Sequence, residues 1–481
     1  MPDREHQPTT APGPARALPA PDRRRVTPGI LHFGVGNFHR SHQAMYLDRL
    51  IRRGEADDWG IVGVGLLARD ARMGEVLRTQ DFTYTLVERA ADGAMAGTRI
   101  GSIIDYLHAP DSPRAVLEAL ASPTIRIVSL TITEGGYHTS DVTGEFDLAN
   151  PDIVADAASS SPRTVFGVLA AGLKLRRERG VAPFTVVSCD NILGNGDVAR
   201  RALVAFAGLA HGAEFANWIR DEVAFPNSMV DRITPVTTDA ERELVRTAFG
   251  IDDAWPVVCE PFVQWVIEDR FTLGRPAWEE VGVQVVDDVE PYERMKLRLL
   301  NGSHQAMAYP GLLAGYDYVH EAVADPHVRE LVERYMRAEA APTLAAVPGI
   351  DLAAYRSELM ERFGNPFIRD TLRRLATDAS DRIPKFLVPV ARDRSAAGLA
   401  SPAAAAVVAA WAAHARKVLS SGASLDDRNH DLVAAAISDA DADPQRFLAH
   451  RDWFGDLADD RAFVDAFTAA FESMTRTAAQ P

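Results

Sequence analysis

Cysteine is scarce in this chain of 481 residues, where only Cys189 and Cys259 occur. Two cysteines cannot build a disulfide framework. They are also too few for the zinc enzymes that combine a structural site of four cysteines with a catalytic site of two cysteines and a histidine. We therefore expect no metal ion.

Long apolar runs are missing as well. No run reaches the about 18 residues that a membrane-spanning helix requires. Residues 1–27 are rich in proline, alanine and arginine and lack the apolar core of a secretory signal. They predict a disordered lead-in. We expect a cytoplasmic protein with no membrane partner.

Positive charge is in deficit, with 51 Lys and Arg against 67 Asp and Glu and a net charge of −16. A nucleic-acid partner requires clustered basic residues that neutralise phosphates, so we expect none. The hydrophobic fraction of 47% is ordinary for a globular protein. The length is too great for one compact core, which predicts two domains.

The first part of the chain alternates between strand and helix patterns. Residues 30–36 (ILHFGVG) predict a buried strand that ends in a glycine turn, and residues 59–67 form a second apolar run after a helical stretch. Further strand patterns occur at residues 83–87, 125–132 and 183–188. Continuous apolar runs are typical of buried parallel strands. We predict an α/β fold, with a Rossmann-type doubly wound sheet over residues 28–287.

From about residue 290 the pattern is helical, and segments such as 292–309 and 396–413 are separated by Pro, Gly or Asn. No comparable strand patterns occur there. We predict a mainly α-helical C-terminal domain over residues 288–481.

The glycine turn after the first strand has the sequence GVGNFHRSH, residues 34–42. Gly34 and Gly36 would let the backbone turn tightly and approach a pyrophosphate. The third glycine of the usual fingerprint is replaced by His39, so a purely structural turn is an open alternative. Arg40 could add positive charge near a phosphate, or be a solvated helix residue.

The residue that reads the adenosine ribose is expected after the second strand, in GLLARDARM. Asp70 could accept hydrogen bonds from ribose hydroxyls, which favours NAD as the cofactor. Arg69 and Arg72 could instead take a 2′-phosphate, which leaves NADP as the alternative. The candidate cofactor-binding residues are Gly34, Gly36, Phe38, Arg40 and Asp70.

Two more motifs directly follow predicted strands, where ligands bind in such sheets. Glu134 in TITEGGY could gate or relay protons, although a turn with a capping role fits equally well. Asn191 in SCDNILGNG offers a neutral amide to a developing oxyanion. An asparagine in a glycine-rich turn is also common for backbone reasons alone.

The helical segment YERMKLRLLNGSHQ, residues 292–305, carries several chemically capable side chains. At about 100° per residue, with Lys296 as zero, Glu293 falls at about 60°, His304 at about 80° and Asn301 at about 140°. These four side chains share one broad face. A solvated helix face is the alternative, because the segment mixes both charges.

Together these motifs resemble the mannitol dehydrogenase family of polyol-specific long-chain dehydrogenases. The resemblance covers about residues 28–475 and rests on an ordered set of motifs: GVGNFHRSHQ, WGIVGVGL, SLTITEGGY, CDNILGNG, FPNSMVDRITP, EPFVQWVIEDRF, KLRLLNGSH and SDRIPKFLVPV. It implies an N-terminal nucleotide-binding domain, a helical C-terminal domain and an active site in the cleft between them. It also implies a lysine acid–base with no metal.

The resemblance further implies a role for individual residues. Lys296 would be the acid–base, and Asn191 with Asn301 would polarise the reacting oxygen. His304 and Asp231 would contact substrate hydroxyls, and Glu134 and Glu293 would lie close to the proton path. The basic residues of the region that binds substrate are Arg374, Arg382 and Lys385.

The expected reaction interconverts a polyol and a ketose by hydride transfer to and from NAD or NADP. Mannitol and fructose are the first choice, and the hexuronate reductases and arabinitol 4-dehydrogenases of the family are the alternatives. A non-catalytic cofactor-bound sensor, or a metal-dependent polyol dehydrogenase using His39, His42 or His304, is a remote alternative. The resemblance permits a monomer or a small homo-oligomer.

Overall fold

The computed structural model describes residues 16–139 and 144–477. The chain divides into two units at Val289–Glu290, apart from the hairpin tip Ala91–Gly93. This division falls close to the predicted boundary at residue 287. Among the residues described, none of the helices combines the length and apolar character needed to cross a membrane.

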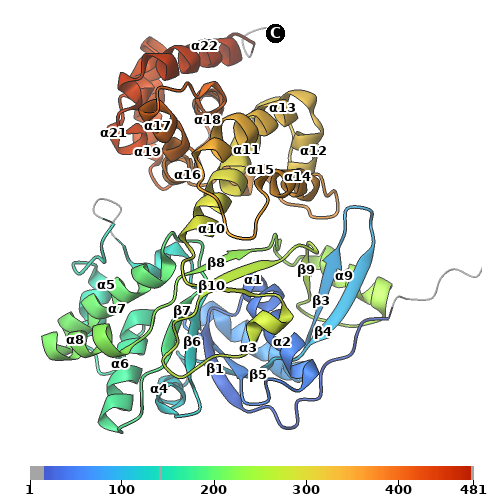
Figure 1. Ribbon diagram of the computed structural model, residues 1–481, viewed down its shortest axis with the longest axis vertical. Coiled ribbons are helices and arrows are strands. Elements are labelled where there is room, and N and C mark those ends of the chain that lie inside the picture. The colour runs from blue at the N-terminus through green and yellow to red at the C-terminus, as the bar shows by residue number, and fades with distance from the viewer. Residues whose placement is uncertain (1–15, 140–143, 478–481) are drawn as a thin grey trace, which may run out of the picture. The chain divides into compact units, whose positions relative to one another are not determined.

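A five-stranded parallel sheet forms the centre of the first unit (Figure 1). Its spatial order is β5-β2-β1-β6-β7, so the chain starts in the middle and builds outward in both directions. Because all five strands are parallel, their carboxyl ends meet at one edge, where ligands bind in doubly wound folds. The strands are β1 (Pro28–Phe33), β2 (Gly60–Gly65), β5 (Ile103–His108), β6 (Ile127–Leu130) and β7 (Thr185–Ser188).

The side chains of these strands alternate between two cores, because successive residues of a strand point to opposite faces. Leu31 and Phe33 belong to one core and Ile30 to the other; Val128 and Ile127 divide in the same way. Burial on both faces explains the continuous apolar runs and confirms the doubly wound prediction. One core includes α4 (Pro113–Ala121), α6 (Val165–Glu178) and α7 (Asn195–His211), and the other includes α2 (Gln43–Arg53) and α3 (Ala71–Thr79).

The prediction that residues 83–87 join the parallel sheet was wrong. Strand β3 (Tyr84–Arg89) pairs antiparallel with β4 (Met95–Ile100) and parallel with β9 (Val257–Cys259). A third sheet contains β8 (Ser228–Asp231), β10 (Gln264–Glu268) and β11 (Gln284–Val286). The remaining helices of this unit are α1 (Asn37–Ser41), α5 (Pro151–Ala157), α8 (Ala213–Glu222) and α9 (Asp239–Phe249).

The predicted disordered lead-in does not hold for residues 16–27, which lie against the sheet of β3 and β4. Leu18 bridges Thr98, accepting a hydrogen bond from Arg99 N–H and donating one to the Gly97 carbonyl, both at 2.8 Å. Arg23 pairs with Asp81 at 2.7 Å. Residues 1–15 of the predicted lead-in lie outside the described residues.

The second unit is helical, as predicted. Its first helix is α10 (Glu290–Met295), which continues through a π-helical segment (Lys296–Asn301) into α11 (Gly302–Ala314). Its further α-helical and π-helical elements are α12 (Val319–Ala324), α13 (Pro326–Arg334), a second π-helical segment (Tyr335–Ala340), α14 (Leu352–Phe363), α15 (Leu372–Ala376), α16 (Ala379–Phe386), α17 (Val388–Ala396), α18 (Pro402–Ser420), α19 (His430–Ala442), α20 (Gln445–Leu448), α21 (Arg451–Phe454) and α22 (Arg461–Thr477). Helix α11 packs against α15 and α18, and α18 packs along α22.

Candidate active site

The glycine turn after β1 has the backbone shape that a dinucleotide requires. Gly34 has a φ of +92°, and a Cβ there would lie 2.8 Å from the carbonyl carbon of Thr131, so only glycine fits. Gly36 is exposed, and a Cβ there would meet nothing closer than 3.9 Å. The backbone at Gly36 is therefore open to the close approach of a pyrophosphate.

Asp70 lies just beyond the carboxyl end of β2, held by the turn that it caps. Its Oδ2 atom accepts hydrogen bonds from the backbone N–H groups of Leu66 at 3.0 Å and Leu67 at 2.9 Å. This fixes the half-buried carboxylate at the edge where the ribose is expected. Arg69 is exposed, and Arg72 lies over the Trp255 ring at 5.4 Å.

Arg40 does not have the position expected of a phosphate ligand. It is fully buried, and its guanidinium donates to Trp255 O at 2.5 Å and Asn37 Oδ1 at 2.7 Å. Burial lowers its pKa to about 10. These hydrogen bonds give Arg40 a structural role inside the first unit. Phe38, also a candidate cofactor residue, stacks on His42 at 4.9 Å.

The loop after β6, which carries Glu134, has a strained backbone. Thr133 has φ 62° and ψ 167°, a region that residues with a side chain rarely adopt. The Asp190 carboxylate accepts hydrogen bonds from the N–H groups of Thr133 at 2.8 Å and Ile132 at 3.1 Å. Tyr137, at the end of the loop, donates its hydroxyl to the same carboxylate at 2.8 Å. Glu134 itself is exposed.

Asp190 was missed in the sequence, although it precedes the predicted Asn191. Burial raises its pKa to about 6, against the lowering effect of its hydrogen-bond donors. Its neighbour Asn191 is exposed after β7. Asp190 thus joins the loop of Glu134 to the turn of Asn191. An aspartate directly beside an amide candidate was the only signal in the sequence.

Asn195 is a second residue that the sequence reasoning missed. Its side-chain amide donates to the carbonyls of Asp190 at 3.0 Å and Ser228 at 2.7 Å, and its Oδ1 accepts from Ser228 N–H at 2.9 Å. These bonds tie the turn of Asn191 to β8, which ends at the buried Asp231. The residues predicted at the strand ends are therefore linked by buried amide and carboxylate groups.

The predicted face around Lys296 is buried. The exposed fractions are 7% for Glu293, 8% for Lys296, 8% for Asn301 and 9% for His304. A solvated helix face would be exposed, so that alternative is wrong. Burial of two charged and two polar side chains on one face is costly unless they interact with each other or with a ligand. The His304 ring lies 5.2 Å from the Phe363 ring.

The helix around Lys296 departs from the ideal α-helical geometry on which the predicted angles rest. Residues Lys296–Asn301 are π-helical, which means bonding from i to i+5 and more residues per turn. With about 85° per residue in this segment, Asn301 falls at about 65° from Lys296 instead of about 140°. The same correction moves His304 from about 80° to about 5°. The π-helical segment therefore gathers these side chains into a narrower sector than predicted.

Asn301 presents an unused acceptor on this face. Among the described residues, its buried Oδ1 atom has no hydrogen-bond partner. A buried carbonyl-type oxygen without a donor costs about 1–3 kcal/mol, which a ligand hydroxyl would recover. The amide group is thus suited to hold a hydroxyl-bearing ligand.

The three basic candidates for substrate binding have different partners. Arg374 pairs with Asp370 at 2.5 Å, and Lys385 pairs with Asp381 at 2.7 Å, each one helical turn away. Arg382 donates to the carbonyls of Arg374 at 2.8 Å and Leu375 at 3.1 Å. The hydrogen-bond partners of Arg382 are neutral carbonyls, and Asp378 interacts with its charge without a direct ion pair within 4 Å among the described residues. Arg382 is therefore less fully paired than Arg374 and Lys385, and it is the best placed of the three to attract an anionic or hydroxyl-rich ligand.

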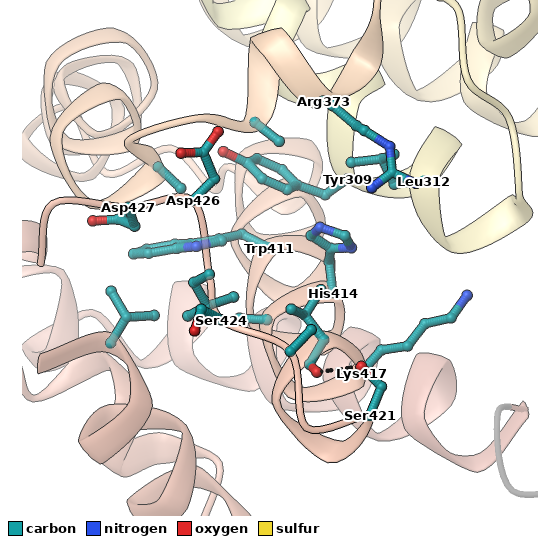
Figure 2. A pocket seen from close by; sticks show the side chains of 17 residues that line it. Tyr309, Leu312, Arg373, Trp411, His414, Lys417, Ser421, Ser424, Asp426 and Asp427 are labelled. Atoms are coloured by element: carbon teal, nitrogen blue, oxygen red, sulfur yellow. Dashed lines mark hydrogen bonds between the residues drawn. The ribbon is translucent and has the colours of Figure 1, made fainter. Parts of the chain in front are cut away.

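A cavity of about 490 Å³ lies elsewhere in the helical unit (Figure 2). Trp411 and Tyr309 form its apolar part, and Arg373, His414 and Lys417 lie to one side of them. Burial and nearby positive charge lower the pKa of His414 to about 4, so its ring is neutral at pH 7. The lining includes none of the predicted site residues.

Within the described residues, no three His, Cys, Asp or Glu side chains form a group that could hold a metal ion. His39 stacks on His32 with ring centroids 3.4 Å apart, deep in the first unit. His42 has hydrogen bonds at both ring nitrogens, to Gln264 O at 2.8 Å and Gln43 Nε2 at 2.9 Å. These histidines thus serve packing and hydrogen bonding.

Comparison with known proteins gives the family. Residues 28–280 match the family model of the mannitol dehydrogenase Rossmann domain, and residues 288–475 match that of the mannitol dehydrogenase C-terminal domain. The chain belongs to the mannitol dehydrogenase family. Its curated relatives in this family include mannitol 2-dehydrogenase of Cereibacter sphaeroides, 45% identical over 465 residues, which are 96% of this chain and 97% of that protein. Mannitol dehydrogenase 2 of Saccharomyces cerevisiae is 44% identical over 466 residues, 95% of this chain and 92% of that protein.

Two solved structures of the same architecture match over nearly the whole chain. Pseudomonas fluorescens mannitol 2-dehydrogenase, in a ternary complex with NAD and D-mannitol, has a TM-score of 0.87 at 47% identity and 98% coverage of both chains. A D-sorbitol dehydrogenase in substrate-free form has a TM-score of 0.87 at 36% identity and 96% coverage of both chains. Both family domains are therefore present in this member of the mannitol dehydrogenase family.

Proposed function

We propose that this chain interconverts D-mannitol and D-fructose, with NAD as its cofactor. The observation that carries the proposal is the buried face of Glu293, Lys296, Asn301 and His304. It occurs in a chain that is 45% identical to a mannitol 2-dehydrogenase along 96% of its length. A hexuronate reductase or arabinitol 4-dehydrogenase activity finds no comparable support.

Lys296 is the proposed acid–base. In oxidation, its neutral amine takes the proton from the C2 hydroxyl, and in reduction the ammonium returns that proton to the ketone oxygen. Burial disfavours the charged form of an amine, so the position suits a base that must be neutral near pH 7. The nicotinamide ring of the bound cofactor supplies the hydride acceptor.

Asn301 and Asn191 are the proposed amides that polarise the reacting oxygen. Neutral amides stabilise alkoxide character without competing for the proton, and one such donor contributes about 3 kcal/mol to the barrier in comparable oxyanion sites. The π-helical segment supports this role for Asn301, because it turns the amide toward the face of Lys296. His304 and Asp231 are proposed to contact the other hydroxyls, and Glu134 and Glu293 to lie on the proton path.

The first unit carries groups that fit NAD. The open backbone at Gly36 suits the pyrophosphate, and the fixed Asp70 carboxylate suits the ribose hydroxyls. A carboxylate at this point repels a 2′-phosphate, which favours NAD over NADP. Gly34 shapes the turn. Arg382 is the proposed basic residue toward substrate; Arg374 and Lys385 are secondary candidates, because each has a carboxylate partner.

A substrate panel tests the proposal. Oxidation of mannitol, arabinitol and sorbitol, and reduction of fructose and fructuronate, are each measured with NAD(H) and NADP(H). The expected result is the highest kcat/KM for mannitol with NAD and for fructose with NADH. A preference for fructuronate or arabinitol would assign another member of the family, and a preference for NADP would reject the role of Asp70.

We further propose a cytoplasmic location and a monomer or small homo-oligomer. Cell fractionation tests the location, and light scattering on the purified protein gives its mass in solution.

A further inference from the structure

The π-helical segment Lys296–Asn301 requires a structural explanation, because such segments are rare and are poorer in energy than an α-helix. They occur where a side chain or a ligand stabilises the widened turn. The candidate here is Tyr335, which lies 0% exposed at the start of the second π-helical segment. Its hydroxyl donates a hydrogen bond to the carbonyl of Arg298 at 3.0 Å. Arg298 is in the middle of the widened turn, so Tyr335 supplies a donor to a carbonyl of that turn.

Gly302 makes room for the phenol. A Cβ at this position would collide with the Tyr335 hydroxyl and lie 2.9 Å from the ring atoms Cε1 and Cζ. The backbone of Gly302 is ordinary helix, with φ −61° and ψ −38°, so its conformation does not require glycine. A glycine inside a helix costs about 1 kcal/mol relative to alanine. Space for Tyr335 is therefore the physical reason for glycine in the NGSH motif.

The π-helical segment that carries Tyr335 is anchored to a neighbouring helix. Glu339, in the same π-helical segment, accepts hydrogen bonds from the backbone N–H groups of Ala403 at 2.6 Å and Ala404 at 2.8 Å, at the start of α18. Arg298 is fixed from its other side, by Asp393 at 2.7 Å and by Thr343 O at 3.0 Å. The widened turn is thus fastened to α17 and α18 through residues outside the predicted site.

We propose that Tyr335 is a positioning residue that maintains the π-helical segment. Its hydroxyl bonds to the widened turn, and the absence of a side chain at Gly302 leaves room for its ring. The π-helical segment in turn brings Asn301 and His304 onto the face of Lys296. The inference rests on the proposed function of Lys296 and Asn301. If the segment reverted to α-helix, Asn301 would turn away from Lys296 by about 75°. Catalysis would then lose alignment while the cofactor site in the other unit stayed intact.

Tyr335→Phe tests the inference, because it removes the hydrogen bond and keeps the ring. Tyr292→Phe is the matched control. Tyr292 is also buried and lies in α10, which runs directly into the widened turn. Its hydroxyl donates a hydrogen bond at 2.8 Å to the carbonyl of Pro348, which is outside that turn. Both variants lose one tyrosine–carbonyl hydrogen bond, fully buried at Tyr335 and partly buried at Tyr292, so Y292F controls for the loss of such a bond and should lose no more stability than Y335F. We expect Y335F to lower kcat at least about 10-fold, since small misplacements in an active site have such effects. Its Kd for NADH should stay within about 2-fold of wild type, and Y292F should retain wild-type kcat.

Gly302→Ala provides a second, independent test of the proposal. Because it disturbs the same contact, its effect on kcat should be non-additive with Y335F in a double-mutant cycle. Additive effects would mean that the two residues act separately, and would overturn the shared role.

A crystal structure of Y335F separates this inference from the proposed function. Reversion of residues 296–301 to α-helix, or displacement of Asn301, is the expected result. An unchanged π-helical segment with unchanged kcat would overturn the inference, as would equal losses of kcat in Y335F and Y292F. Failure of the wild-type protein to oxidise mannitol would refute the proposed function instead, and the structure of Y335F would still decide whether Tyr335 maintains the segment.

Discussion

Replacing Asp190 by asparagine tests whether one carboxylate holds the loop of Glu134 and the turn of Asn191 in place. The carboxylate accepts from Ile132 N–H, Thr133 N–H and the Tyr137 hydroxyl. In the asparagine variant, an NH₂ group replaces one acceptor oxygen and faces a backbone donor. At least one buried N–H then loses its partner, which costs about 1–3 kcal/mol.

A second effect of Asp190→Asn has the opposite sign. Burial raises the pKa of Asp190 from 3.8 to about 6, so the ionised carboxylate costs about 3 kcal/mol of stability at neutral pH. This cost disappears as the pH falls through 6 toward 3.8, because the folded state takes up the proton first. Asparagine has no such cost at any pH. The two effects nearly cancel at pH 7.5, whereas wild type should gain about 1.4 kcal/mol relative to the variant between pH 7.5 and pH 5.

Activity should respond differently from stability. Without the carboxylate, the strained Thr133 backbone relaxes, and we expect kcat/KM for mannitol to fall about 100-fold. Asp156→Asn is the control. Asp156 lies on α5 and is also buried, and its carboxylate accepts hydrogen bonds from the N–H of Arg163 and from the N–H and hydroxyl of Thr164. This variant should lose stability and keep kcat/KM.

Urea unfolding at pH 7.5 and pH 5, together with initial rates, provides both measurements. A stability difference between wild type and D190N that does not change with pH would refute the burial argument. An unchanged kcat/KM in D190N, or an equal loss in D156N, would refute the role of Asp190 in placing the two loops.

Three further predictions concern the reaction and its pH dependence. Lys296→Ala should lower kcat at least about 1,000-fold while NADH still binds, since a positioned acid–base contributes about 10²–10⁴; near-normal turnover would reject the assignment. Asp70→Ala should raise KM for NAD at least about 10-fold, because charge-assisted hydrogen bonds to the ribose are lost, and should change KM for NADP much less. Equal changes in KM for NAD and for NADP would contradict the ribose contact. Burial lowers the pKa of His32 from 6.5 to about 3, so the folded state loses stability as the pH falls below 6.5. In urea unfolding, the free energy of unfolding of wild type should fall by about 1.4 kcal/mol relative to that of His32→Asn between pH 7.5 and pH 5.5. A difference between the two proteins that does not change with pH would contradict burial of the neutral ring.

The sequence predicted the features that depend on nearby residues. The apolar run of β1 and the glycines after it gave the strand and the turn, because continuous burial and tight backbone approach leave a local pattern. The four side chains predicted to share the Lys296 face are all buried, and their catalytic role stays a prediction. The predicted angles on that face were wrong, because the π-helical segment depends on Tyr335, whose position no helical period reveals.

Other errors have the same origin in distant contacts. Arg40 resembled a phosphate ligand, but its buried partner is the carbonyl of Trp255, and a carbonyl leaves no trace in the side-chain pattern. Leu18 belonged to a stretch without a core pattern, yet its backbone pairs with Gly97 and Arg99. Asp190 escaped notice because two of its donors are backbone N–H groups.

The carboxylate of Asp190 also sets a rule for engineering this scaffold. The Asp190 carboxylate, in the turn at 188–195, accepts hydrogen bonds from three donors in residues 132–137, so the two segments behave as a single exchangeable module. A loop graft intended to change the accepted sugar would have to transplant both segments together. A graft of either segment alone would leave backbone donors unpaired, and the new loop would lack the support that shapes it.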